Sequence, residues 1–300
     1  MKALVTGAHG FVGRHLMAHL IELGDVVVGV DHECDVTEEV SVREELQRTL
    51  PDAIYHLAAL THVGTSWSQQ IEFTRVNVLG TRNVLERAHE VVPDAVVVVT
   101  SSANVYGIVR TEDLPLVETF RVAPSDPYGS SKVGAELAAQ DAVRDFGSRV
   151  VIARPFNHIG PGQSDTFVVP AIVNRLLESV DKGLDEIVVG DLTTRRDFCD
   201  VRDVVRAYRL LAERGVSGEV YNIASNSDVS LQEIANQLVA DIAPHVALVK
   251  DPELLRPAEI QVLRGSFDKL RAQTGWEPTI PLHQSLLDVV SDMRLRRSEQ

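Results

Sequence analysis

Cysteine and basic residues are scarce in this 300-residue chain. Two cysteines, Cys34 and Cys199, cannot build a disulfide framework, and such low usage indicates a reducing compartment. Lysine and arginine number 29 against 43 acidic residues, which leaves a net charge of −14. Because a general nucleic-acid binder needs a basic face, this balance disfavours that class of protein, although it is compatible with a local basic pocket.

Long apolar runs are also lacking. No stretch reaches the roughly 18 consecutive apolar residues of a membrane span. The segment 1–7 indicates a short strand and a turn rather than a signal peptide, so we expect a cytoplasmic protein. The ten histidines are scattered and predict no metal site. Hydrophobic residues make up 44% of the chain and charged residues 24%, which is typical of a soluble globular enzyme.

The first half alternates short apolar runs with segments of helical periodicity. We expect strands at 3–6, 26–30, 53–57, 95–100 and 149–153, and helices at 11–23, 40–50, 70–91 and 128–146. The strands are apolar on both faces, as in a parallel sheet that helices cover on each side. This alternation predicts an α/β fold with a doubly wound, Rossmann-type parallel sheet.

The pattern loosens further along the chain. Residues 155–166 are rich in proline, glycine and polar groups and predict a loop. Beyond it we expect helices at 167–180, 201–214, from 231 onward and 281–296, with strands at 186–189, 219–223 and 246–249. We interpret residues 1–158 as a nucleotide-binding domain, completed by about 193–226, and residues 159–300 as a smaller, interleaved α/β domain.

A glycine-rich loop lies between the first strand and the first helix. Gly7 allows a tight turn, Gly10 lets the backbone approach a pyrophosphate, and Gly13 lets the helix pack closely on the strand. The helix N-terminus then faces the phosphates with the positive end of its dipole. This placement between strand and helix favours a dinucleotide site over a simple turn.

An acidic residue ends the second strand. Asp31 stands where a carboxylate binds the adenosine ribose hydroxyls of NAD and repels the extra phosphate of NADP, so NAD(H) is favoured and NADP(H) stays possible. The alternative is a solvated acid in a turn. Asp35 and Val36 follow, near the expected position of the adenine edge.

Three polar residues indicate proton chemistry. Tyr128 and Lys132 stand four residues apart at a helix start and therefore share one helical face. A nearby ammonium lowers the pKa of a tyrosine, which makes such a pair a general acid–base. Ser102 follows the strand at 95–100, at the carboxyl edge where open α/β sheets bind ligands, although a turn-capping serine would fit there equally well.

Several motifs together resemble the extended short-chain dehydrogenase/reductase family of nucleotide-sugar epimerases, dehydratases and reductases. They are the glycine loop, His56-Leu57-Ala58-Ala59, Asn77-Val78-Leu79-Gly80-Thr81, Ser102, Tyr128 with Lys132, and Arg196-Asp197-Phe198. The resemblance implies Ser102, Tyr128 and Lys132 as catalytic residues. It also implies a cofactor site that comprises Gly7, Gly10, Phe11, Val12, Gly13, Asp31, Asp35, Val36, Leu57, Ala58, Ala59, Asn77, Tyr128, Lys132 and Pro155.

Three further stretches are similar to the GDP-mannose branch of that family, namely 154–163, 195–203 and 256–259. Within it, the similarity to the reductases of GDP-4-keto-6-deoxy-D-mannose implies hydride transfer from NAD(P)H to the C4 ketone, with GDP-D-rhamnose as the product. The resemblance makes 159–300 the nucleotide-sugar domain. It also implies a homodimer through the helices at 70–91 and 128–146.

The residues implied for substrate binding are divided between the two ends of the nucleotide sugar. Arg196 and Arg256 are the candidates for the diphosphate, because a guanidinium fork suits phosphate oxygens. The other candidates are Glu259 for the ribose, Asn157 for a phosphate, Ser66 and Ser102 for the sugar, and Phe167 with Val168 for the guanine. Without the resemblance, an Arg196–Asp200 surface ion pair and a turn at 256–257 would be the simpler interpretations.

Other reactions of the family are weighed on chemistry. A 4,6-dehydratase carries an acid just after the catalytic hydroxyl, where this chain has Ala103 and Asn104. A 3,5-epimerase/reductase uses a cysteine near the serine, whereas Cys199 lies far along the chain and His158 stands alone. Ketone reduction remains, with a 4-epimerase or a dehydratase-like enzyme as alternatives. A catalytically inactive nucleotide-binding regulatory protein is the alternative of another class.

Overall fold

A computed structural model describes residues 1–251 and 260–298. Its first part contains β1 (Lys2–Thr6), α1 (Phe11–Glu22), β2 (Val26–Val30), α2 (Glu39–Thr49), β3 (Ala53–His56), α3 (Val63–Ser66), α4 (Gln70–Thr74), η1 (Arg75–Gly80), α5 (Thr81–Val91), β4 (Val96–Thr100), η2 (Ala103–Tyr106), η3 (Thr111–Asp113), α6 (Pro127–Phe146) and β5 (Arg149–Pro155). The rest contains β6 (Asn157–Ile159), α7 (Val168–Lys182), β7 (Glu186–Val189), β8 (Arg195–Arg196), β9 (Phe198–Asp200), α8 (Val201–Arg214), β10 (Val220–Ile223), β11 (Val229–Ser230), α9 (Leu231–Ile242), β12 (Ala247–Lys250), β13 (Val262–Leu263), α10 (Asp268–Thr274) and α11 (Leu282–Ser298).

Six strands form the central sheet in the order β10-β5-β4-β3-β1-β2, and every neighbouring pair is parallel. β-Branched residues dominate these strands, and all five residues of β4 are buried. A parallel sheet needs cover on both faces because its strands are apolar on both sides. The α/β, Rossmann-type fold class predicted from the sequence is confirmed.

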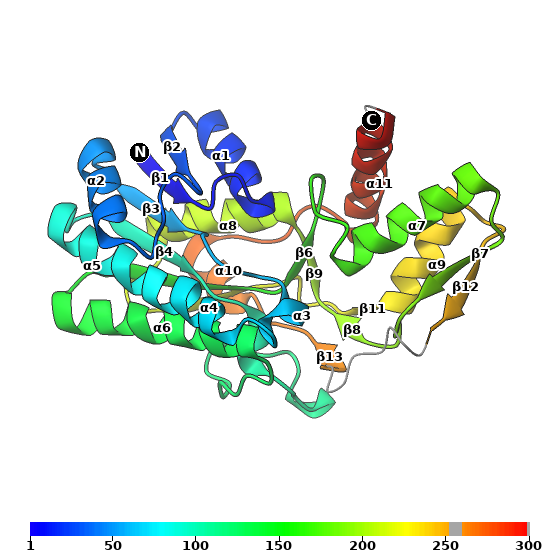
Figure 1. The fold of residues 1–300 in the computed structure, drawn as a ribbon. Helices are drawn as coiled ribbons and strands as arrows, with labels where there is room; N and C mark the ends of the chain where they lie inside the picture. Colours follow the sequence, from blue (N-terminus) through cyan, green and yellow to red (C-terminus); the bar gives the residue numbers. More distant parts are fainter. Residues whose placement is uncertain (252–259, 299–300) are drawn as a thin grey trace.

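Helices cover the two faces of this sheet, and alternate strand residues pack against each layer. Ala3 and Val5 contribute to the core with α1 and α8, whereas Leu4 between them contributes to the core with α2, α5 and α6. Figure 1 shows α1 and α8 on one side of the sheet and α5 and α6 on the other. This arrangement leaves the carboxyl edge of the sheet for the loops that follow β1, β3, β4 and β5.

A second body lies beside the sheet and has a core of its own (Figure 1). Helices α7, α9 and α11 pack together and against the parallel pair β7 and β12. The short strands β8, β11 and β13 form a separate small sheet between the two bodies. Strand β10 returns from this part of the chain to the edge of the six-stranded sheet. We keep the division into 1–158 with about 193–226, and the remainder of 159–300, as a proposal.

Two local expectations are corrected. The segment 155–166 is not entirely a loop, because 157–159 pairs with 198–200 as the parallel strands β6 and β9. The segment 70–91 is not one regular helix, because residues 75–80 form a π-helical turn between α4 and α5. Such insertions disturb the hydrophobic period only slightly, so periodicity alone does not reveal them.

Candidate active site

The glycine loop lies at the point where the strand order reverses direction. The chain passes from β1 to β2 on one side and then to β3 on the other, which leaves a crevice at the carboxyl ends of β1 and β3. Gly7 has φ +70°, and a Cβ there would lie 2.8 Å from the Ala58 amide nitrogen. A Cβ on Gly13 would lie 2.2 Å from the Gly7 carbonyl oxygen. Glycine is therefore required at both positions for the loop to pack against the backbone after β3 and for α1 to pack against the loop.

A buried hydrogen-bond network holds the segment after β3 against this loop. The Thr6 hydroxyl accepts from the Ala58 amide at 3.2 Å and lies 2.9 Å from His56 Nδ1. The other ring nitrogen of His56 lies 3.0 Å from the Thr81 hydroxyl. Burial, assisted by the charge of Lys132, lowers the pKa of His56 to about 3, so the ring is neutral at physiological pH. This places Leu57, Ala58 and Ala59 beside the glycine loop.

The acids after β2 differ in their contacts. The Asp31 carboxylate accepts the His9 amide of the glycine loop at 3.0 Å. The Asp35 carboxylate accepts both the amide and the hydroxyl of Thr37, and these bonds lower the pKa of Asp35. Val36 is buried. Asp31 is thus the carboxylate tied directly to the candidate dinucleotide loop.

Asn77 lies in the π-helical turn and joins two parts of the site. Its side-chain oxygen accepts the Leu60 amide at 2.8 Å, and its amide nitrogen donates to the Leu60 carbonyl and to the Ser131 hydroxyl at 2.9 Å each. Asn77 is fully buried, and these bonds use its side chain on both sides. It therefore fixes the segment after β3 to helix α6.

The structure brings Ser102, Tyr128 and Lys132 together at the carboxyl edge of the sheet. The Ser102 side chain lies close enough to Tyr128 to affect its pKa, and it caps η2 by accepting the Asn104 backbone amide at 3.2 Å. The Asp126 carboxylate caps α6 by accepting the Gly129 amide at 2.7 Å, which places Tyr128 in the first turn. Lys132 follows one turn later, and its Nζ donates to the Thr100 carbonyl at 2.9 Å.

The pKa of Tyr128 departs from the expectation. Burial raises it to about 12 against the opposing hydrogen bond from Ser102, whereas the sequence analysis predicted a lowered value. Burial also lowers the pKa of Lys132 to about 8 against the opposing charge of Glu136. The Lys132 Nζ lies 6.0 Å from the centre of the tyrosine ring and is bonded to Thr100. In this arrangement Tyr128 keeps its proton at neutral pH and is suited to donate it.

The residues expected to contact the base and the sugar are in different environments. Phe167 and Val168, where α7 begins, are both exposed, and the His62 ring meets Phe167 edge-on. Ser66, in contrast, is buried, and its hydroxyl donates to the Val63 carbonyl at 2.7 Å. The exposed pair is therefore accessible as the structure stands, whereas Ser66 would reach a sugar only after its hydroxyl leaves Val63.

The diphosphate candidates lie on β6 and β8. Asn157 and Arg196 are both half-buried, and Arg196 donates to the Arg195 carbonyl at 2.9 Å. The acid of the alternative ion pair, Asp200, binds the Arg202 guanidinium through both carboxylate oxygens. Pro155 ends β5. Arg256 and Glu259 lie outside the described residues.

Comparison with known proteins decides the family. Residues 3–224 match the NAD dependent epimerase/dehydratase family. The chain belongs to this family. It is 39% identical to a GDP-6-deoxy-D-mannose reductase of Pseudomonas aeruginosa, over 100% of this chain and 99% of that protein. It is 34% identical to a GDP-6-deoxy-D-talose 4-dehydrogenase of Aggregatibacter actinomycetemcomitans, over 98% of each.

A solved structure of RMD from Pseudomonas aeruginosa, complexed with NADPH, has the same fold. The TM-score is 0.91 at 36% identity, over 99% of this chain and 100% of that one. The resemblance predicted from the motifs is confirmed, and with it an NAD(P)-dependent enzyme of the epimerase/dehydratase family. Among the described helices, none combines the length and the apolar character needed to cross a membrane.

Sequence reasoning missed several residues of this epimerase/dehydratase site. It did not foresee the hydrogen-bond partners of His56 or the bond between Ser131 and Asn77. It also missed the hydrogen bond that the Asn104 side-chain nitrogen donates to Asp126 at 3.3 Å. Each depends on elements far apart in the chain. His158, weighed as the histidine of a 3,5-epimerase/reductase, lies 3.0 Å from the Phe156 carbonyl and stacks on Phe11, the first residue of α1.

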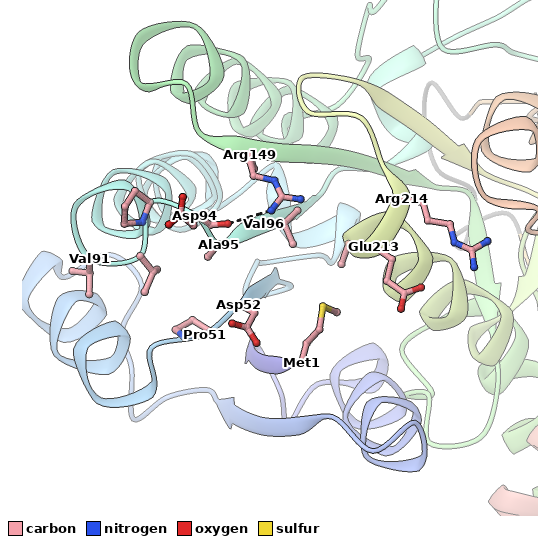
Figure 2. Close-up of a pocket in the computed structure, with 13 residues that line it drawn as sticks. Met1, Pro51, Asp52, Val91, Asp94, Ala95, Val96, Arg149, Glu213 and Arg214 are labelled. Atoms are coloured by element: carbon pink, nitrogen blue, oxygen red, sulfur yellow. Dashed lines mark hydrogen bonds between the residues drawn. The ribbon is translucent and has the colours of Figure 1, made fainter.

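A hollow of about 840 Å³ lies at the opposite edge of the sheet, away from these residues. Figure 2 shows that its walls come from the amino ends of the strands and from α8, with Arg149 bonded to the Asp94 carbonyl. It is lined by Met1, Pro51, Asp52, Val91, Val92, Pro93, Asp94, Ala95, Val96, Arg149, Ala212, Glu213 and Arg214. Because ligands of open α/β sheets bind at the carboxyl edge, this hollow does not replace Ser102 and Tyr128 as the candidate site.

Proposed function

We propose that the protein reduces the C4 ketone of GDP-4-keto-6-deoxy-D-mannose to GDP-D-rhamnose with NAD(P)H. The observation that carries this proposal is the meeting of Ser102, Tyr128 and Lys132 beside the glycine loop. The full-length identity of 39% to a GDP-6-deoxy-D-mannose reductase supports the choice of substrate. The absence of a carboxylate at positions 103 and 104 supports reduction over elimination.

The cradle at the glycine loop fits a dinucleotide. The tight loop at Gly7, Gly10 and Gly13 would bring the N-terminus of α1 to a pyrophosphate, and Asp31, bonded to this loop, would bind the adenosine ribose. Leu57, Ala58 and Ala59 line the nicotinamide side, with Asn77 holding the segment after β3. The bound reduced nicotinamide supplies the hydride.

The side chains of the protein supply orientation and the proton. The Ser102 hydroxyl donates a hydrogen bond to the C4 oxygen and stabilises the negative charge that develops there. Tyr128 gives its proton to that oxygen as the alcohol forms, since burial keeps the phenol protonated. Lys132 would hold the nicotinamide ribose, and it supplies positive charge near the resulting phenolate. These groups are positioned before the reaction, which lowers its entropic cost.

We infer that NADH is preferred over NADPH. The Asp31 carboxylate stands at the end of β2 and already accepts a glycine-loop amide, so an added 2′-phosphate would meet its negative charge. The relative of known structure is complexed with NADPH, so both cofactors belong in the assay. A comparison of kcat/KM for NADH and NADPH tests this preference.

The substrate-binding roles follow the same division as the ligand. We propose Arg196 and Arg256 for the diphosphate, Asn157 for a phosphate, Glu259 for the ribose, Phe167 and Val168 for the guanine, and Ser66 and Ser102 for the sugar. The excess of acidic residues over basic ones would then lie mainly on the solvent-exposed surface. The arginines proposed for the diphosphate would make the binding site locally positive.

A homodimer is part of the proposal. Ile71 on α4, Leu79 on η1 and Leu137 on α6 are 86%, 53% and 56% exposed, although these elements pack on one another. Large apolar side chains gathered on neighbouring elements are typical of a covered surface. We propose that a second copy of the chain covers them.

One assay tests the central proposal. The purified protein is mixed with NADH and enzymatically prepared GDP-4-keto-6-deoxymannose, and NADH oxidation is followed. We expect oxidation, with the rhamnose configuration in the NMR spectrum of the product. In a second assay on a GDP-sugar that bears a C4 hydroxyl, inversion at C4 without net change in NADH would instead indicate the 4-epimerase. Binding without turnover in either assay would indicate the inactive regulatory protein.

A further inference from the structure

A fully buried ion pair lies directly behind the three proposed catalytic side chains. Glu136 on α6 and Arg154 on β5 are about 5% and 4% exposed. The guanidinium donates from Nε and Nη2 to the two carboxylate oxygens, at 2.7 Å each. A buried pair of this kind costs desolvation energy and is weak evidence for stability alone. Stability alone therefore does not explain why this pair lies next to the candidate catalytic residues.

The pair contacts the segment that carries Ser102 at two points, one before Ser102 and one after it. The Ser101 hydroxyl donates to the Glu136 carboxylate. On the other side, Arg154 Nη1 donates to the Tyr106 hydroxyl at 3.1 Å, and this hydroxyl in turn donates to Asn222 on β10 at 2.7 Å. Ser101 and Tyr106 bracket Ser102 and the short helix η2 that it caps. A shift of the pair would therefore move the Ser102 hydroxyl.

The pair also governs the charge around Lys132. Glu136 stands one helical turn after Lys132, and its negative charge opposes the effect of burial on the pKa of that lysine. The other groups that face Lys132 are Tyr128 on the same helix, the Thr100 carbonyl on β4 and neutral His56 on β3. Arg154 faces Glu136 from β5 and neutralises part of its charge. Among these groups, Glu136 supplies the negative charge.

We propose that Glu136 and Arg154 form a positioning pair that orients Ser102 through Ser101 and Tyr106 and keeps Lys132 charged. This role rests on the proposed reductase function. Neither residue touches the substrate, so the pair acts through Ser102 and Lys132 alone.

The test compares pH profiles of NADH-dependent ketone reduction for the wild type and Glu136→Gln. We expect kcat to fall about 100-fold, since small misplacements in an active site cost that much, while KM changes less than about threefold. Without the carboxylate charge, Lys132 loses its proton at lower pH. The alkaline limb of kcat should therefore move down by about one pH unit. Glu136→Asp keeps the charge and should keep the wild-type limb at a reduced kcat.

Asp25→Asn is the matched control. Asp25 forms a comparably buried pair with Arg209, whose Nε lies 2.7 Å from the carboxylate, and it belongs to the loop before β2 at the opposite edge of the sheet. This variant should lose a similar amount of thermal stability, as judged by Tm, and keep the wild-type pH profile. A pH shift common to both variants would show a general effect of losing a buried charge and would overturn the proposal.

A double variant keeps the proposal testable if Glu136→Gln alone does not fold. Glu136→Gln with Arg154→Met leaves neither position of the pair with an unpaired charge, and such replacements are often tolerated. If only the double variant folds, its alkaline limb decides: a downward shift supports the role, and an unchanged limb contradicts it. A wild type that does not reduce the ketone sugar would overturn the proposed function. An active wild type with an unaltered profile in Glu136→Gln would overturn the positioning role alone.

Discussion

Tyr128 is the residue on which the proposed chemistry depends most directly. Its phenol is buried and protonated, and it lies near Ser102. We expect Tyr128→Phe to lower kcat by about 10²- to 10⁴-fold, because a positioned general acid contributes that range. NADH affinity, measured by fluorescence titration, should change little, since the ring remains in place.

Tyr55→Phe is the matched control for Tyr128→Phe. The Tyr55 hydroxyl is buried and has no hydrogen-bond partner among the described residues. Its removal should leave kcat unchanged and keep or raise Tm, because an unsatisfied buried hydroxyl is unfavourable. Full ketone reduction by Tyr128→Phe would remove Tyr128 from the mechanism.

Asp31 carries the prediction on cofactor choice. In Asp31→Asn the negative charge beside the glycine loop is lost, so the ratio of kcat/KM for NADPH to that for NADH should rise by at least about tenfold, or about 1.4 kcal/mol. Asp94→Asn, which removes one charge at the opposite edge of the sheet, should leave the ratio unchanged (Figure 2). An equal ratio in wild type and Asp31→Asn would show that Asp31 does not select the cofactor.

At the scale of elements, the close packing of α1 against the loop after β1 explains why the sequence has glycine at position 13. A Cβ at Gly13 would meet the backbone oxygen of Gly7, and backbone cannot move aside as a flexible side chain can. Gly13→Ala should therefore destabilise the fold by about 1–3 kcal/mol through overpacking and weaken NADH binding. Urea unfolding and NADH titration measure the two effects. An unchanged NADH affinity would show that the loop still binds the cofactor when α1 lies further from it.

Elements differ in how much of them local sequence specifies. The six strands of the central sheet and α1 follow from apolar runs and turn residues, which act within a few positions, and the structure confirms these elements. The dinucleotide-binding role of the glycine loop between them stays a prediction. The π-helical turn at 75–80 and the strand at 157–159 depend on distant partners: Asn77 binds Leu60 and Ser131, and β6 pairs with β9. The Glu136–Arg154 pair also depends on distant partners. The sequence shows that Glu136 stands four residues after Lys132, but not that Arg154 on β5 lies against it. The roles assigned to the catalytic, cofactor-binding and substrate-binding residues, Ser66, Arg256 and Glu259 among them, stay predictions.

At the scale of the whole molecule, the exposed apolar residues on α4, η1 and α6 carry the prediction on oligomeric state. Figure 1 shows α4, α5 and α6 along one outer side, away from α7, α9 and α11. We expect the wild type to be a dimer by light scattering after size-exclusion chromatography. Leu137→Glu should raise the dimer dissociation constant by at least about 100-fold, because burying an unpaired carboxylate is costly.

Leu295→Glu separates this effect from a general loss of surface apolarity. Leu295 is 61% exposed on α11, on the other body of the molecule, and is thus as accessible as Leu137. We expect this variant to remain dimeric. Dissociation by both variants would show that the interface is not confined to α4, η1 and α6, and a monomeric wild type would overturn the dimer proposal outright. Because Tyr128 and Lys132 lie on the same helix as Leu137, the activity of a monomeric Leu137→Glu would also show whether α6 needs its partner to hold the catalytic face in place.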